Sequence, residues 1–331
     1  MKGIAKAGEE MDSISGILAL ALRTRLQKKA WKKEKLEEIR LRIGKPVWIL
    51  YAGKGMYLSE RGGFTEDLQE AYWVTEEDLR ETLSYASNYS LYAMEEQLRQ
   101  GYFTIAGGHR IGVAGRIVME HGKWKQIAHI AMMNIRIAHE VIGCARKLMP
   151  YLKKRQWCST LLISPPGGGK TTLLRDCIRI LASEEEKMTV GVVDERSEIA
   201  ACKNGVPQNQ LGITVDVLDG CSKEIGMLHL LRAMAPDVIA VDEIGTLSDQ
   251  EVILQVNHCG CILFATMHGT CMQELKRKKW MEDLLQERVF ERYVFLDHHF
   301  HVGNIKEIYD ENGKRIFCEK EERMLYVTDY R

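Results

Sequence analysis

The sequence has little proline, no net charge and no long apolar run. Only 6 of its 331 residues are proline, and it contains no low-complexity tract, which excludes a long Pro-rich or collagen-like region. Its 46 Lys and Arg balance 46 Asp and Glu, so it does not coat nucleic acid by bulk positive charge. The longest apolar stretch near the N-terminus, 14–22, is shorter than the roughly 20 residues that span a bilayer, and it lacks the small-residue cleavage site of a secretory signal. We therefore expect no integral membrane segment.

The cysteines do not predict a disulfide framework. There are 9 of them, an odd number, and they are scattered along the chain, which is typical of reduced thiols in the cytoplasm. Cys259 and Cys261, with His258 and His268 nearby, come closest to a zinc pattern. A second pair of ligands is missing, however, and Cys261 opens an apolar segment that we expect to be a buried strand. The cysteines therefore predict no zinc site.

The balanced charge is unevenly distributed. Residues 1–60 carry 13 basic and 7 acidic side chains, a net charge of +6, whereas residues 151–270 carry 11 and 15, a net charge of −4. Much of the basic excess lies at 23–33. This segment is either the solvated face of a helix or a contact for an anionic membrane surface or a partner.

Length and pattern predict two α/β domains after a basic start. We expect a helical segment at 1–35, a mixed α/β domain at 36–150, and a nucleotide-binding domain with a C-terminal extension at 151–331, joined through the stretch 139–156. In the first domain, strands are predicted at 39–43, 47–51 and 133–138, and a Gly-rich hairpin at 103–118. A helix is predicted from Thr75, as N-cap, to about Gln100.

A phosphate-binding loop (P-loop) is predicted at the start of the second domain. The apolar strand 159–163 is followed by a Gly-rich segment and then by apolar residues at helical spacing, which is the context that this motif requires. Backbone N–H groups and the helix N-terminus bind phosphate oxygens, Lys170 neutralises them, and the Thr171 hydroxyl binds Mg²⁺. Ser164 departs from the glycine of the pattern. The predicted ATP-binding residues are Ser164, Pro165, Pro166, Gly167, Gly168, Gly169, Lys170, Thr171 and Thr172.

A P-loop requires an apolar strand that ends in a carboxylate near Mg²⁺. Two segments fit, one ending at Asp194 and Glu195 and the other at Asp242 and Glu243. The second follows a long amphipathic helix and a Pro-Asp turn, so we assign Asp242 to Mg²⁺ and Glu243 to the attacking water. The first is expected on the neighbouring strand, with Asp194, Glu195 and Glu198 facing the same crevice. The alternative for these three is a solvated helix start with Arg196.

A third apolar strand at 261–266 ends in polar residues. Thr266 and His268 follow its apolar positions, and we expect this strand to lie beside the one that ends at Asp242. A polar group at that place can sense the γ-phosphate, which gives His268 a function that an isolated histidine usually lacks.

The order of these motifs resembles that of the type II and type IV secretion ATPases, which are RecA/AAA+-like. The segments 39–46, 107–116, 134–138, 193–199 and 216–221 resemble one branch more closely, the stage III sporulation protein AA family. Together these matches span about 37–275. The resemblance implies an α/β chain in which a RecA/AAA+-like domain, with a largely parallel sheet covered by helices, follows a mixed α/β domain.

The resemblance also implies an activity and partners. It implies a Mg²⁺-dependent ATPase in the mother cell, assembled as a ring of six subunits on membrane proteins of the channel between mother cell and forespore. Arginines of the N-terminal domain reach the nucleotide in related motors, and the candidates here are Arg110, Arg116 and Arg136, with Arg232 weaker. We expect no DNA or RNA partner, because the Arg-x-x-x-His spacing of a nucleic-acid-binding appendage is absent. A nucleic-acid-remodelling ATPase and a nucleotide-gated scaffold without turnover remain alternatives.

Overall fold

The computed structural model describes residues 14–89, 98, 101–105, 107–120, 122–202, 204–297 and 304–319. They form two compact units, one within Met1–His139 and one within Glu140–Arg331. The division falls at the start of the stretch 139–156. Each unit has its own sheet and its own buried apolar core.

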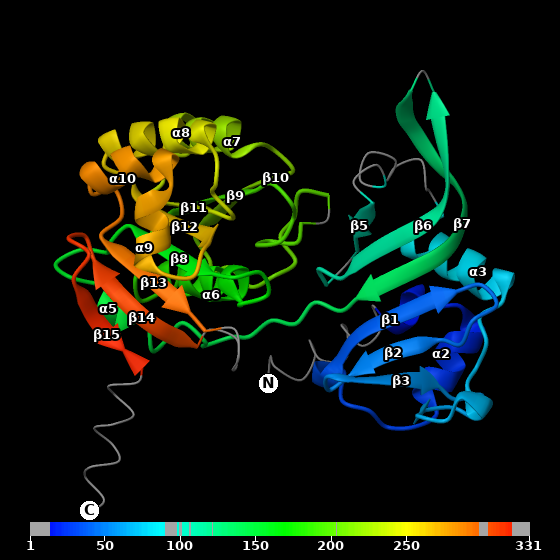
Figure 1. Cartoon of the computed structure of the whole chain (residues 1–331). Helices are drawn as coiled ribbons and strands as arrows, with labels where there is room; N and C mark the ends of the chain where they lie inside the picture. Colours follow the sequence, from blue (N-terminus) through cyan, green and yellow to red (C-terminus); the bar gives the residue numbers. More distant parts are fainter. Residues whose placement is uncertain are drawn as a thin grey trace, which may run out of the picture. The chain divides into compact units, whose positions relative to one another are not determined.

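The first unit is an antiparallel sheet with helices packed on it. Its strands follow the order β4-β3-β2-β1-β7-β6-β5, and every neighbouring pair is antiparallel (Figure 1). Leu22 and Leu26 of α2 are buried with strand residues, so the helix in the basic N-terminal stretch belongs to this core. The elements are α2 (Leu20–Gln27), η1 (Lys33–Lys35), β1 (Leu36–Arg42), β2 (Trp48–Tyr51), β3 (Lys54–Leu58), β4 (Phe64–Thr65), η2 (Leu68–Glu70), α3 (Glu76–Ala86), β5 (Tyr102–Thr104), β6 (Arg110–Glu120) and β7 (Lys123–Arg136).

The predicted helix from Thr75 begins as expected but is shorter. Thr75 caps α3, and its hydroxyl accepts a hydrogen bond from the backbone N–H of Asp78. The helix ends at Ala86, because Asn88 and Tyr89 adopt the left-handed backbone conformation that terminates helices. The prediction of one continuous helix to Gln100 is therefore wrong at 87–89, and residues 90–97 and 99–100 lie outside the described residues.

The second unit is a largely parallel sheet covered on both faces. Its strand order is β10-β9-β11-β12-β8-β13-β14-β15, and only the pairs of β14 with β13 and β15 are antiparallel. The elements are α5 (Met149–Leu152), β8 (Thr160–Ser164), α6 (Lys170–Leu181), β9 (Val190–Asp194), β10 (Val215–Asp219), α7 (Lys223–Ala233), β11 (Val238–Val241), α8 (Leu247–His258), β12 (Ile262–His268), α9 (Met272–Arg277), η4 (Lys279–Met281), α10 (Glu282–Gln286), β13 (Arg292–Leu296), β14 (Ile305–Asp310) and β15 (Arg315–Cys318).

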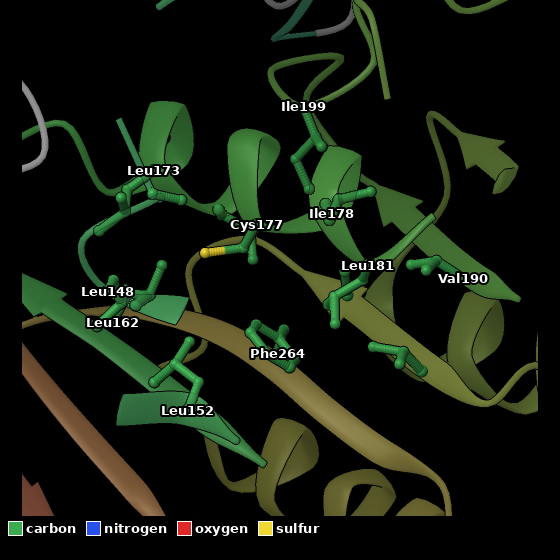
Figure 2. Packing of buried hydrophobic residues seen from close by; sticks show 14 of the residues in the cluster. Leu148, Leu152, Leu162, Leu173, Cys177, Ile178, Leu181, Val190, Ile199 and Phe264 are labelled. Atoms are coloured by element: carbon green, nitrogen blue, oxygen red, sulfur yellow. The ribbon is translucent and has the colours of Figure 1, made fainter. Parts of the chain in front are cut away.

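Successive side chains of the central strands point to opposite faces of the sheet, which gives one apolar layer on each face. On β8, Leu162 packs in the cluster with α6, whereas Leu161 and Ile163 pack in the cluster with α7 and α8. Figure 2 shows Cys177 of α6 above Leu162 and Phe264. A strand buried on both faces is a continuous apolar run, which is the pattern of these segments. The predicted α/β fold with a parallel sheet covered by helices is confirmed, and it brings the carboxyl ends of β8, β9, β11 and β12 to one edge.

Candidate functional site

The P-loop joins β8 to α6. Gly167 and Gly169 have φ values of 76° and 80°, a region that side chains disfavour. Ser164, at the position where the motif has glycine, is buried, and its Oγ donates to the Pro165 carbonyl at 2.8 Å. A Cβ atom at Gly168 would lie 2.3 Å from Ser164 Oγ. The serine therefore fits this loop because residue 168 has no side chain.

Lys170 is the first residue of α6, and its ammonium group points back at the loop. Its Nζ lies 3.2 Å from the Ser164 carbonyl oxygen, 3.3 Å from that of Pro165 and 3.0 Å from Nδ1 of His268. Burial lowers the pKa of Lys170, and nearby carboxylates, Asp242 first among them, oppose this shift. The Lys170 ammonium group is buried and lies against the P-loop, whose backbone N–H groups also bind anions. It is therefore suited to bind phosphate oxygens.

Thr171, at the start of α6, and Asp242, directly after β11, come together although β8 and β11 are not adjacent strands. Thr171 Oγ1 donates to Asp242 Oδ2 at 2.8 Å, across β12, which lies between β8 and β11. The other oxygen of Asp242 accepts a hydrogen bond from Thr266. A hydroxyl beside a carboxylate, both on the partly exposed edge of the sheet, is a pair of hard oxygen donors. Such donors are the ligands that Mg²⁺ prefers, so these residues fit the ion.

Glu243 is held at both its backbone and its side chain. Its φ is 48°, in the left-handed region, and its N–H donates to Thr266 Oγ1 at 2.9 Å. Its carboxylate lies 2.9 Å from Nε2 of His268 through Oε1, and 2.9 Å from Nη1 of Arg196 through Oε2. Arg196 was predicted only as part of a solvated helix start and not as a partner of Glu243. The signal was available, because it is the basic residue of an acidic strand end.

The predicted order of the three strand ends is confirmed, since β11 pairs with β9 on one side and with β12 on the other. Thr266 differs from its prediction. It is fully buried, and its hydroxyl is engaged by Asp242 and by the N–H of Glu243. Thr266 therefore orients the two acidic residues, and the polar group of β12 at the exposed edge is His268.

Asp194 does not face the crevice, so that expectation is wrong. Its carboxylate is buried and accepts hydrogen bonds from the backbone N–H groups of Glu198, Ile199 and Ala200 at 2.7, 3.0 and 2.7 Å. Burial raises the pKa of Asp194, and these three donors oppose the shift. Asp194 therefore stabilises the loop after β9 by accepting hydrogen bonds from its backbone.

We expect the free energy of unfolding of the Asp194→Ala protein to be about 3 kcal/mol lower than that of the wild type. Three N–H groups lose their acceptor, two of them in buried hydrogen bonds and one in a partly buried bond. Urea denaturation measures this change. Glu195→Gln is the matched control, since Glu195 is partly exposed and pairs with Lys223; its change is expected to stay within about 1 kcal/mol. An Asp194→Ala protein as stable as the wild type would show that the loop is held by other contacts.

A cavity of about 700 Å³ adjoins the predicted site. Glu195, Glu243 and His268 line it together with Arg196, Lys223 and Trp280. The structure therefore gathers three of the predicted site residues around one cavity. Glu198 acts on Lys170 electrostatically and also belongs to this edge of the sheet.

The candidate arginines lie on strands of the first unit, as predicted. Arg110 on β6 stacks over the Tyr102 ring at 4.5 Å and lies directly opposite Arg136 on β7. Residues directly opposite each other on paired strands have their side chains on the same face of the sheet, so Arg110 and Arg136 together form a basic site. Arg116 is exposed further along β6. Arg232 is exposed on α7 of the second unit.

Comparison with known sequences assigns a family. The family model described as "Sporulation stage III, protein AA" matches residues 8–316. Stage III sporulation protein AA of Bacillus subtilis (strain 168) is 42% identical over 281 residues, which cover 84% of this chain and 88% of that protein. The predicted resemblance is confirmed.

Comparison with solved structures shows the fold. The ATPase DotB of Legionella pneumophila is 13% identical with a TM-score of 0.55, over 88% of this chain and 80% of that one. The pilus retraction motor PilT, solved with bound ADP, is 15% identical with a TM-score of 0.56, over 89% and 85%. The chain therefore has the fold of secretion-type P-loop ATPases. Over the residues that the structure describes, every helix is too short or too polar to cross a bilayer.

Proposed function

Because the chain belongs to the sporulation stage III protein AA family, we propose that it is a Mg²⁺-dependent ATPase of the secretion-motor type, which converts ATP and water to ADP and phosphate. The observation that supports this most directly is the 2.8 Å contact between Thr171 and Asp242, with Glu243 as the next residue. This contact joins the P-loop helix to the acidic strand end. It places a binding group for Mg²⁺ beside a candidate general base.

The P-loop residues bind the substrate. Backbone N–H groups of residues 167–171 and the N-terminus of the 12-residue helix α6 provide positive potential for the phosphates. Lys170 exchanges its contact with His268 for phosphate oxygens, which carry more charge than an imidazole nitrogen. Thr171 and Asp242 hold Mg²⁺, which neutralises phosphate charge when it is bound.

Glu243 activates water. A carboxylate oxygen accepts the proton as the water oxygen attacks the terminal phosphorus, and ADP leaves. His268 lies between Lys170 and Glu243, so it is placed to contact the phosphoryl group that is transferred. Thr266 keeps the Glu243 backbone fixed during this step.

We place this activity in a hexameric ring that docks on membrane proteins of the channel between mother cell and forespore and energises or assembles that channel. The protein then lies in the mother-cell cytoplasm at the forespore membrane. The basic stretch 23–33 is the candidate contact on the membrane side. Arg110 and Arg136 together, or Arg116, would supply positive charge to a nucleotide from a neighbouring copy.

Steady-state phosphate release tests the proposal. The purified chain is assayed with ATP and Mg²⁺, alone and with the membrane protein recovered from sporulating cells by pull-down. We expect release that requires Mg²⁺ and increases with the partner. A chain that binds ATP but releases no phosphate in either case would be a nucleotide-gated scaffold.

Activity is expected to depend on assembly, because an arginine from another copy completes the site. The rate per subunit should fall on dilution through the concentration range in which sedimentation shows conversion to monomer. A constant rate per subunit across that range would contradict a site shared between copies.

A further inference from the structure

Four side chains form a continuous line along the edge of the second sheet. Strands β9, β11, β12 and β8 are consecutive in the sheet. Arg196 and Glu243 follow β9 and β11, His268 ends β12, and Lys170 begins α6 after β8, so the side chains follow the order of the strands. Arg196 Nη1 lies 2.9 Å from Glu243 Oε2. Glu243 Oε1 lies 2.9 Å from His268 Nε2. His268 Nδ1 lies 3.0 Å from Lys170 Nζ.

Donor chemistry gives this line a direction. An ammonium group has donors only, so Lys170 donates to His268 Nδ1. When Nδ1 accepts, the ring N–H at Nε2 is the donor to Glu243 Oε1. Each carboxylate oxygen of Glu243 thus has its own donor: His268 donates to Oε1, and Arg196 donates to Oε2.

The two ends of the line differ in what the nucleotide does to them. Under the proposed function, Lys170 exchanges His268 for phosphate oxygens, so His268, which contacts Oε1 of Glu243, loses its donor at Nδ1. Arg196 is in a loop that is fixed independently of the nucleotide: Asp194 binds the backbone at 198–200, and Ser197, with φ of 52°, donates to Asp219 at 2.6 Å. The contact of Arg196 with Oε2 is therefore retained.

We infer that Arg196 is a positioning residue for Glu243, which holds Oε2 so that Oε1 faces the attacking water. This inference rests on the proposed ATPase function. The bond is formed at the exposed edge, where the side chains of Arg196 and Glu243 are 58% and 37% accessible. An exposed ion pair of this kind contributes little to folding stability, so its loss should change turnover without unfolding the protein.

Arg196→Gln tests the inference in the full-length, assembled protein. A misplaced catalytic group of this kind lowers kcat by about 10-fold or more, and the KM for ATP should change less than about twofold. Arg196→Lys, which keeps a cation but loses the planar fork, should recover part of kcat. Arg315→Gln is the matched control, because Arg315 pairs with Glu307 at 3.3 Å on β15 and β14, away from the P-loop; it should keep the wild-type kcat.

A double-mutant cycle with Glu243→Gln separates positioning from a general structural role. Residual turnover of Glu243→Gln is measured with radiolabelled ATP, and adding Arg196→Gln should lower it no further, because Arg196 acts through Glu243. The same fold loss in both backgrounds, or a wild-type kcat in Arg196→Gln, would overturn the inference and leave the proposed function intact. Absence of turnover in the wild-type complex would overturn the proposed function, and this inference with it.

Discussion

The Glu243→Gln protein is expected to bind ATP as tightly as the wild type and to release phosphate at least about 100-fold more slowly, the loss typical of a removed general base. Glutamine keeps the size of the side chain and can still accept from Arg196 or His268, so the site geometry is preserved. It cannot take a proton from water. Titration calorimetry with ATP and steady-state phosphate release measure the two quantities separately.

Glu251→Gln is the matched control for this substitution, because Glu251 is an exposed residue on α8. It should keep the wild-type affinity and rate. If the Glu243→Gln protein hydrolyses ATP at the wild-type rate, Glu243 is not the base. In that case Glu195, which lines the same cavity, would be the next candidate.

The Lys170→Ala protein is expected to lose at least about 100-fold in affinity for ATP, since charge-assisted hydrogen bonds to phosphate contribute roughly 1.5–3 kcal/mol each. The substitution also removes the hydrogen bond from Lys170 to His268 Nδ1. The position of His268, which contacts Glu243, should therefore change as well. Equilibrium binding of ATP with Mg²⁺, measured by calorimetry, gives the affinity.

Lys314→Ala is the comparison for general charge effects, because Lys314 is exposed in the turn between β14 and β15. Its affinity for ATP should equal that of the wild type. A Lys170→Ala protein that still binds ATP at the wild-type affinity would show that the loop N–H groups suffice without the ammonium group.

The second unit was predictable because its motifs are local. A strand, a Gly-rich loop and a helix are encoded within about twenty residues, and the apolar runs around Asp194, Asp242 and Thr266 have the pattern of strands buried on both faces. Parallel strands in such a sheet must end at one edge, so the meeting of Asp242 with the P-loop followed from topology.

Side-chain direction at the strand ends was not predictable in the same way. Asp194 and Asp242 follow nearly identical apolar runs, yet Asp194 turns inward to three backbone N–H groups and Asp242 faces Thr171. The difference depends on the backbone path after each strand, which is set by contacts distant in sequence. The pairing of Arg196 with Glu243 joins residues 47 apart and was missed for the same reason.

The packing of Ser164 against Gly168 has a consequence for how this loop can change in evolution. The two atoms that come within 3 Å of a methyl group added at residue 168 are the Oγ and Cβ of Ser164. With glycine at position 164, both atoms would be absent and alanine at 168 would meet the Pro165 carbonyl at 3.3 Å as its nearest atom. The two positions are therefore coupled: serine at 164 disfavours any side chain at 168, and the cost of exchanging residue 168 falls when residue 164 is glycine.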